Sequence, residues 1–184
     1  YNAKEIVDAL KTFTFEEFTS EAELTTKAAV LLSQGKIIGW FQGKSEFGPR
    51  ALGGRSILAN PKEAVMKSKV NNIKLREQFR PFAGSVLQEK VDQLFEVPQK
   101  NYFSPFMTFC FKVKPSSKNK VAAITHKDDT CRIQTVSKKD GIYYDLIKKF
   151  DKLTGIPCIL NTSFNLAGEP LVETPEQAIA DFQK

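Results

Sequence analysis

The sequence has little histidine and little cysteine, which restricts the chemistry that it can support. His126 is its one histidine, and its three cysteines, Cys110, Cys131 and Cys158, lie far apart in the chain. Structural zinc sites need four ligands of these types at close spacing, so the sequence predicts no metal-binding residues. A single histidine also gives no basis for a Ser–His–Asp or Cys–His catalytic set.

Long apolar runs are absent too. No run approaches the ~20 residues needed to cross a bilayer, and an apolar content of 41% is typical of a globular protein. The odd number of cysteines, mostly inside apolar runs, predicts reduced thiols, and no secretory signal is present, so we expect a cytoplasmic protein. The first residue is Tyr1 rather than Met, so we expect residues 1–184 to be one domain excised from a longer chain, with residues 1–24 as a lead-in.

Positive charge is concentrated in one segment. Residues 36–80 hold ten Lys or Arg against three Glu, a net charge of +7, whereas the whole chain carries +6. The remainder of the chain is therefore about neutral, at −1. Such a concentration predicts an anionic partner, which can be a nucleic acid, a phosphorylated metabolite or a nucleotide.

Predicted helices and strands follow one another without strict alternation. Helix signals bracket Ser20 to Gly35, and further helices are predicted over residues 62–72, at "VDQLF", over residues 143–153 and from Thr174 onward. Strands are predicted at "KIIGWF", "PFMTFCFKV", "VAAI" and "CILNTS", and "KPSSKNK" is predicted to be a solvated loop. This order favours an α+β or mixed α/β domain.

A glycine-rich segment, "KSEFGPRALGGRS", follows the predicted strand "KIIGWF". Its glycines let the backbone approach a ligand closely, and Lys44, Arg50 and Arg55 are suited to binding phosphate oxygens. By spacing alone, a surface loop with solvated arginines explains the segment equally well. It is not a Walker motif, because no Gly-Lys-Ser/Thr follows the glycines.

Two later segments carry further basic residues. "LREQFRPFAGS" places Arg76 and Arg80 on one face if it is helical, with a solvated face as the alternative. "THKDDTCRIQTV" holds His126 and Arg132. A lone histidine is more often structural than catalytic, so Arg132 is the stronger candidate.

The segment "LNTSFNLAGEP" is rich in short hydrogen-bonding side chains, including Asn161 and Ser163. Such a turn can bind polar ligand groups, although turn chemistry alone also explains it. Taken together, the polar segments favour electrostatic positioning of phosphates over covalent catalysis.

Four segments occur in order between about Gly35 and Phe182: "GWFQGKSEFGPRALGGRSILANP", "NNIKLREQFRPFAGSVL", "DDTCRIQTV" and "TGIPCILNTSFNLAGEPLVETPEQA". Together they resemble the C-terminal domain of the NodU/CmcH-type O-carbamoyltransferases, a family that includes tobramycin carbamoyltransferase. The resemblance implies a YrdC-like fold, which is a twisted open mixed sheet flanked by helices. It is similar to the carbamoyladenylate-forming part of HypF and to threonylcarbamoyladenylate synthases.

The resemblance also implies a function. In that family this domain takes ATP and carbamoyl phosphate and forms carbamoyladenylate, with Mg²⁺ accompanying the nucleotide. A separate, metal-containing N-terminal domain of actin-like fold then moves the carbamoyl group to an acceptor hydroxyl. The implied ligand shell comprises Lys44, Arg50, Arg55, Arg76, Arg80, Arg132, Asn161 and Ser163. Catalytic roles are expected for Arg50, Arg132 and His126.

The sequence departs from the family pattern at two positions. Gly84 stands where proline is usual, and Asp129 replaces a glycine beside the expected phosphate site. Two other functions stay open: a YrdC-like RNA-binding module, favoured by the positive segment with Phe79 and Phe82, and a nucleotide-holding domain that is inert in isolation.

Overall fold

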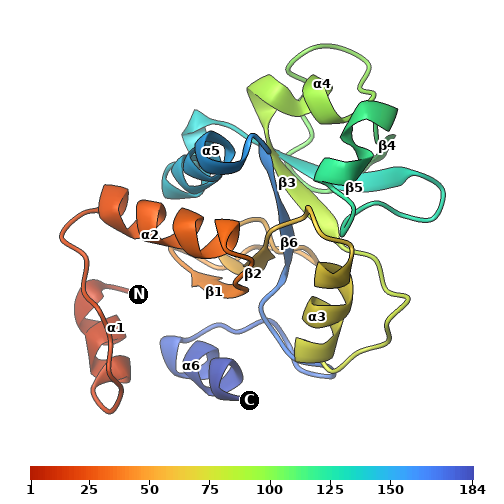
Figure 1. Ribbon diagram of the computed structural model, residues 1–184. Coiled ribbons are helices and arrows are strands. Elements are labelled where there is room, and N and C mark those ends of the chain that lie inside the picture. Colours follow the sequence, from red (N-terminus) through yellow and green to blue (C-terminus); the bar gives the residue numbers. More distant parts are fainter.

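A six-stranded mixed sheet forms the centre of the computed structural model, which describes residues 1–184 (Figure 1). The strands lie in the order β1-β2-β6-β3-β5-β4. All neighbouring pairs are antiparallel except β3 and β5, which are parallel. The predicted mixed α/β class is therefore confirmed.

The central strands are buried on both faces. The strands are β1 (Ile38–Phe41), β2 (Arg55–Ala59), β3 (Ala83–Leu87), β4 (Cys110–Lys112), β5 (Thr130–Val136) and β6 (Cys158–Ser163). Every residue of β2 and β3 is buried, as are the first four of β6. Side chains of a strand alternate between the two faces, so layers of other elements must cover both.

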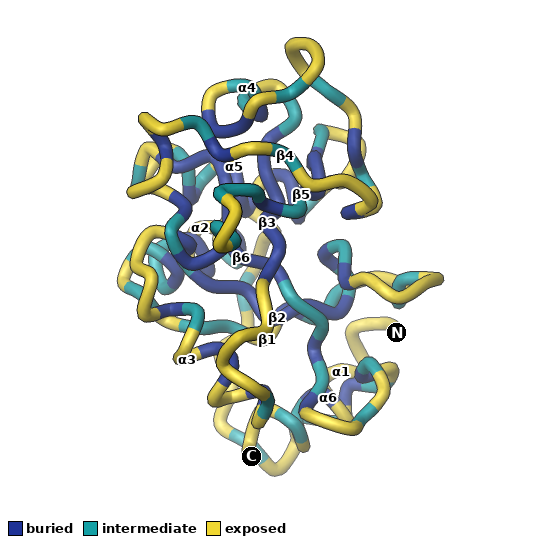
Figure 2. Tube along the Cα trace, turned by 90° about the vertical axis from the view of Figure 1, so that its right-hand side faces the viewer, coloured by how far each residue is buried: buried dark blue, intermediate teal, exposed yellow.

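Helices supply those layers. They are α1 (Ala3–Leu10), α2 (Glu21–Ser33), α3 (Val65–Ile73), α4 (Val91–Leu94), α5 (Ile142–Thr154) and α6 (Pro175–Gln183), with 3₁₀ helices η1 (Gln88–Lys90), η2 (Pro115–Lys120) and η3 (Lys138–Asp140). In Figure 1, α2 and α5 pack side by side on one side of the sheet, and α3 lies on the other. The α1 helix contacts α6 and has no buried residue, and Figure 2 shows it largely exposed. None of the helices has the length and apolarity of a membrane-spanning segment.

The predicted helix ends are confirmed where capping residues mark them. The Ser20 hydroxyl accepts the backbone N–H of Glu23 at 3.2 Å, and α2 ends just before Gly35, whose φ is +78°. Thr174 and Gln177 form the predicted capping box at the start of α6. These bonds satisfy backbone groups that a helix end leaves unpaired.

Two predicted strands are wrong or too long. "VAAI" is a turn, with Ala123 donating its backbone N–H to the Pro61 carbonyl at 2.9 Å, so three of its four apolar residues are buried without strand pairing. Only Cys110–Lys112 of "PFMTFCFKV" pairs with β5. Met107 has a left-handed φ of +54°, which ends the extended run, and the Phe109 side chain is exposed. "KPSSKNK", predicted as a loop, contains the 3₁₀ helix η2.

Both departures from the family pattern have local structural explanations. A Cβ at Gly84 would lie 2.6 Å from Ile124 Cδ1 and 2.8 Å from Cys158 Sγ, so close packing requires glycine there. Asp129 adopts a left-handed φ of +63°, a conformation that glycine adopts readily. Its carboxylate pairs with Lys118 Nζ at 2.8 Å.

Gly53 joins the glycine-rich segment to α5, which yields a test of the packing. An added Cβ at Gly53, whose φ is +106°, would lie 2.4 Å from the Tyr143 ring. We expect Gly53→Ala to lower the free energy of unfolding by roughly 2–5 kcal/mol, since overpacking contributes about 1–3 kcal/mol and the left-handed backbone about 1–2 kcal/mol. Urea denaturation measures the loss.

Gly43→Ala is the matched control. Its φ is +59°, but nothing lies within 4 Å of the added methyl group, so only the backbone penalty of about 1–2 kcal/mol is expected. Equal losses in the two variants would contradict the role of the Tyr143 contact.

Candidate functional site

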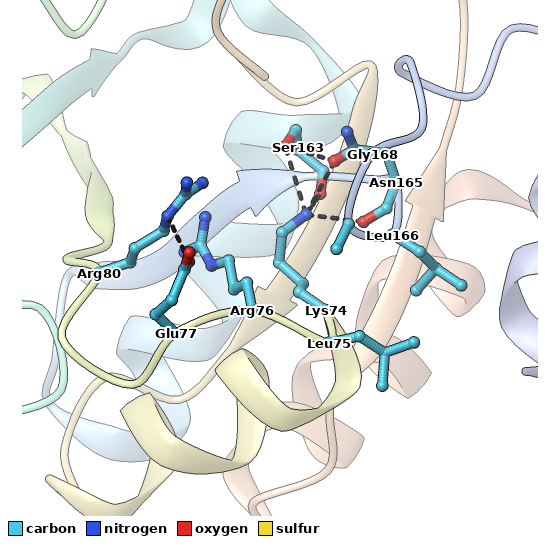
Figure 3. Close-up of a pocket in the computed structure, with 10 residues that line it drawn as sticks. Lys74, Leu75, Arg76, Glu77, Arg80, Ser163, Asn165, Leu166 and Gly168 are labelled. Atoms are coloured by element: carbon cyan, nitrogen blue, oxygen red, sulfur yellow. Dashed lines mark hydrogen bonds and ion pairs between the residues drawn. The ribbon is translucent and has the colours of Figure 1, made fainter.

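A cavity of about 670 Å³ opens beside the end of β6. Its lining comes from two segments, residues 74–80 after α3 and residues 163–168 after β6. Figure 3 shows basic side chains from the first segment facing polar side chains from the second. The lining residues are Lys74, Leu75, Arg76, Glu77, Arg80, Ser163, Asn165, Leu166, Ala167 and Gly168.

Lys74 ties the two segments together. Its Nζ lies 2.6 Å from the Ser163 carbonyl oxygen, 2.8 Å from the Asn165 carbonyl oxygen and 2.8 Å from Asn165 Oδ1. Ser163 Oγ in turn donates to Asn165 Oδ1 at 2.7 Å. Burial, together with the nearby positive charge of Arg76, lowers the pKa of Lys74 to about 7. An anion in the cavity would raise this pKa by favouring the charged form.

Arg76 and Arg80 reach the cavity from an irregular segment after α3, so the helical arrangement that would place them on one face does not occur. Arg76 Nε donates to Asn71 Oδ1 at 2.7 Å, and its guanidinium lies 4.5 Å from the Phe82 ring centre. Arg80 Nε pairs with a Glu77 carboxylate oxygen at 2.9 Å. Burial lowers the pKa of Arg76, and the positive charge of Arg80 adds to that effect.

Arg132 and Arg50 extend the positive region beyond the cavity lining. Burial lowers the pKa of Arg132 on β5, and the positive charge of Arg50 lowers it further. Arg132 also lowers the pKa of Arg76, so the charge of Arg132 lies within reach of both Arg50 and Arg76. Arg132 Nε and Arg76 Nη2 are buried without a hydrogen-bond partner. The fold thus brings together side chains that the sequence places up to 82 positions apart.

Arg55 braces the glycine-rich segment instead of facing the cavity. It is 1% exposed, and its guanidinium donates to the carbonyls of Gln42, Gly43 and Gly54 at 3.0–3.2 Å. The same group lies 3.6 Å from the Phe41 ring centre. A buried guanidinium held in this way cannot reach a ligand without rearrangement, so the prediction that Arg55 binds phosphate is corrected.

Glu46 holds the same segment from its other side. Its Oε1 accepts the backbone N–H of Leu52 at 2.6 Å, of Gly54 at 2.8 Å and of Arg55 at 3.3 Å. Lys44 and Arg50, in contrast, are exposed and form no ion pair with a carboxylate. Of the three basic residues predicted here, two are therefore free to meet a ligand.

Asn161 and His126 stand outside the cavity lining. Asn161 is 1% exposed, and its Nδ2 donates to the Ala51 carbonyl at 3.1 Å and to Ser85 Oγ at 3.0 Å, which supports the glycine-rich segment from below. His126 Nδ1 lies 3.2 Å from Thr130 Oγ1 and its Nε2 lies 3.4 Å from the Phe82 carbonyl oxygen. Both ring nitrogens have partners in the protein, so the structure gives His126 a structural position and does not support the predicted catalytic role.

Lys74 and Asn165 are the site residues that the sequence analysis missed. A usable signal existed for Asn165, because it belongs to the polar run that contains Asn161 and Ser163. Lys74 is one of many lysines in its segment, and only its contact with residues 163–165 distinguishes it.

Comparison with known proteins gives relatives at the level of sequence. Residues 29–184 match the family model described as carbamoyltransferase C-terminus. The chain is 47% identical over 162 residues to nodulation protein NolNO of Sinorhizobium fredii, covering 87% of the chain and 24% of that protein. The chain therefore spans about a quarter of the length of this relative.

Two solved structures share the fold. Sua5 of P. abyssi, complexed with L-threonine, aligns with a TM-score of 0.65 at 16% identity, over 90% of the chain and 45% of that protein. Full-length HypF, in a phosphate- and nucleotide-bound form, aligns with a TM-score of 0.62 at 18% identity, over 92% of the chain and 20% of HypF. The predicted YrdC-like arrangement, a mixed sheet flanked by helices, is confirmed.

The contrast between Arg55 and Arg50 can be tested by stability. Arg55→Met removes the charged guanidinium that donates to three carbonyls, and a hydrogen bond to a charged group contributes about 1.5–3 kcal/mol, so we expect the free energy of unfolding to fall by at least about 2 kcal/mol. The matched Arg50→Met change removes an exposed guanidinium and should alter stability by less than about 0.5 kcal/mol. Thermal and urea unfolding measure both; similar losses would overturn the assignment of Arg55 as a brace.

The lowered pKa of Lys74 predicts a pH dependence of anion binding. Below pH 7 the Lys74 ammonium of the free protein is already charged, so the affinity for tripolyphosphate should not depend on the titration of Lys74. Above pH 7 binding requires proton uptake, so affinity should fall by up to about tenfold per pH unit. Calorimetric titration from pH 6 to 9 measures this, with Lys74→Arg as the control that stays charged. Parallel profiles for the two proteins would contradict the prediction.

Proposed function

Because the chain belongs to the carbamoyltransferase C-terminal family, we propose that it binds ATP and carbamoyl phosphate and forms carbamoyladenylate. One observation carries the proposal: Lys74, Arg76 and Arg80 share one cavity with Ser163 and Asn165. Only one carboxylate, that of Glu77, lines the same cavity. Such an excess of positive charge suits a ligand with several phosphate oxygens.

The proposed reaction has two steps. Carbamoyl phosphate loses its phosphoryl group to water, which yields carbamate and inorganic phosphate. A carbamate oxygen then attacks the α-phosphorus of ATP, and the bond from that phosphorus to the bridging oxygen of pyrophosphate breaks. Pyrophosphate leaves with the electron pair, and the product is the mixed anhydride carbamoyladenylate.

Electrostatics is the main contribution of this chain to that reaction. Both substrates are anions, so their mutual repulsion opposes the approach of carbamate to the α-phosphorus. Arg76 and Arg132 each have a buried guanidinium nitrogen without a partner in the protein. Donors held in place before the substrate arrives stabilise negative charge without reorganising during the reaction. Arg50, exposed on the neighbouring segment, can close on the same anions from outside.

Mg²⁺ enters the proposal as a companion of the nucleotide. The structure contains no group of three or more His, Cys, Asp or Glu that could hold a metal ion, and Glu77 in the cavity is paired with Arg80. A Mg²⁺ ion that is bound mainly by phosphate oxygens and water needs no such group. When bound, it would neutralise part of the phosphate charge.

Transfer to an acceptor requires more than this chain. The chain covers 24% of NolNO, so the relative holds a much longer segment outside the matched region. We propose that an N-terminal domain of actin-like fold, in the same full-length protein, moves the carbamoyl group from carbamoyladenylate to an acceptor hydroxyl.

A nucleic-acid-binding role is the alternative from another class. Its support is the Phe79 side chain, which is 75% exposed and adjacent to Arg80, because bases stack on exposed aromatic rings beside basic residues. Affinity for RNA that falls steeply with salt, together with no ATP binding, would favour this role.

Pyrophosphate release tests the proposed function. The 184-residue chain, given ATP and Mg²⁺, should release pyrophosphate only when carbamoyl phosphate is added. Arg50→Ala should weaken ATP binding by roughly 10- to 100-fold, the size expected for a lost charge-assisted hydrogen bond of about 1.5–3 kcal/mol.

Lys69→Ala is the matched control, since Lys69 is exposed on α3 in the same positive segment but does not line the cavity. It should leave ATP affinity within about twofold, a change below 0.5 kcal/mol. ATP binding without pyrophosphate release would indicate a nucleotide-holding domain that is inert in isolation. Absence of both would reject the proposal.

A further inference from the structure

A second, apolar groove adjoins the basic cavity. It encloses about 220 Å³ and shares two lining residues, Leu75 and Leu166, with that cavity. Its walls include Ile57 of β2, Phe164 and the exposed Phe182 of α6. A ligand that is anionic at one end and flat and apolar at the other can therefore occupy both hollows at once.

A carboxylate lies inside this apolar groove. Asp181 of α6 lines it, and its side chain is only 8% exposed. Its one partner is Lys184 Nζ at 3.3 Å, which lies nearer to Glu169, at 2.8 Å. A carboxylate has about four acceptor positions, so Asp181 keeps acceptor capacity that faces apolar walls. Its negative charge also reaches Lys74, which shows how near the groove lies to the basic cavity.

From this arrangement we infer that the groove is the base-binding subsite of the nucleotide, and that Asp181 selects a purine with an exocyclic amino group. The inference rests on the proposed function, because it takes the phosphates of the same nucleotide to lie in the basic cavity. An amino group on the base donates a hydrogen bond to a carboxylate oxygen of Asp181. A carbonyl at the same ring position cannot donate, so two acceptor oxygens would lie against each other.

Two aromatic rings line the groove: Phe164 is 6% exposed and forms a fixed wall, and Phe182 is 73% exposed, so its ring is free to stack on a base. A Cβ added at Gly39 of β1 would lie 2.8 Å from two atoms of the Phe164 ring, so glycine lets that ring lie close against the strand. Gly39 itself lines the groove, so a larger residue at this position would narrow the groove. Stacking of a base on an aromatic ring contributes about 1–3 kcal/mol, enough to measure by removal.

The test compares ATP with ITP, which carries a carbonyl where ATP has its amino group. For the 184-residue chain we expect ATP to bind at least tenfold more tightly than ITP in a fluorescence or calorimetric titration. Asp181→Asn should reduce this ratio to about threefold or less, because an amide can donate to the carbonyl of ITP. Glu176→Gln, on the same helix and exposed, is the matched charge control and should leave the ratio unchanged.

A second variant does not depend on the carboxylate. Gly39→Ala should weaken ATP binding at least fivefold while leaving the affinity for tripolyphosphate within twofold, since only the base subsite is disturbed. Circular dichroism checks that both variants fold. Tripolyphosphate also separates the two proposals, because it needs the basic cavity and not the groove.

Three results would overturn the inference. ATP binding with an ATP-to-ITP ratio that Asp181→Asn does not change would reject the subsite alone and leave the proposed function standing. If Asp181→Asn changes the ratio of ATP to 2′-deoxy-ATP affinity but not the ratio of ATP to ITP affinity, Asp181 contacts the ribose and not the base. Binding of tripolyphosphate with equal affinity to ATP in the unaltered chain would mean that the base makes no contact, and no binding of ATP at all would reject both proposals.

Discussion

Burial of positive charge is the constraint on which the site depends. Lys74, Arg76 and Arg132 each have a lowered pKa, chiefly because burial disfavours the charged form, and repulsion by a neighbouring arginine adds to that effect. Carboxylates would relieve that repulsion, but they would also neutralise the charge that a ligand needs. The fold instead holds Lys74 and Arg76 with uncharged oxygens: backbone carbonyls and an asparagine side chain for Lys74, and an asparagine side chain for Arg76. Such partners fix the position of a cation and leave its charge available to an anion.

Uncharged side chains also hold the glycine-rich segment, and they come from strands that are neighbours in space but distant in sequence. The strand β6 lies between β2 and β3, so Asn161 can reach Ser85 on one side and the carbonyl of Ala51 above the sheet. Gln134 of β5 accepts from Ser85 Oγ at 2.7 Å and donates to the Leu52 carbonyl at 2.8 Å. Three adjacent strands thus hold the glycine-rich segment by its own backbone. This support allows Arg50 to project from a loop that is otherwise anchored.

The sequence predicts most accurately the features that neighbouring residues determine, such as the ends of helices. Helix ends at Ser20 and Thr174 follow from side chains that cap the next few residues, and the structure has both. The error at "VAAI" arises because burial and strand pairing give the same apolar pattern, and only tertiary structure separates them. Arg50 and Arg55 likewise look equivalent in sequence. Arg55 pairs with Phe41 in the sheet and is buried, so it braces the segment, whereas Arg50 is free.

Lys74 could not be identified in this way, because its partners lie about ninety positions further along the chain.

The next residue, Leu75, has a backbone conformation that is unfavourable for leucine. Leu75 has a left-handed φ of +50°, and its side chain is 70% exposed. Leucine in this conformation costs about 1–2 kcal/mol, and an exposed side chain recovers little of it through burial. The contacts of the flanking residues must offset this cost. The sharp turn at Leu75 lets Lys74 and Arg76 line one cavity, although Leu75 separates them in the sequence. The same turn places that apolar residue on the boundary with the neighbouring groove, so one strained residue separates the charged part of the site from the apolar part.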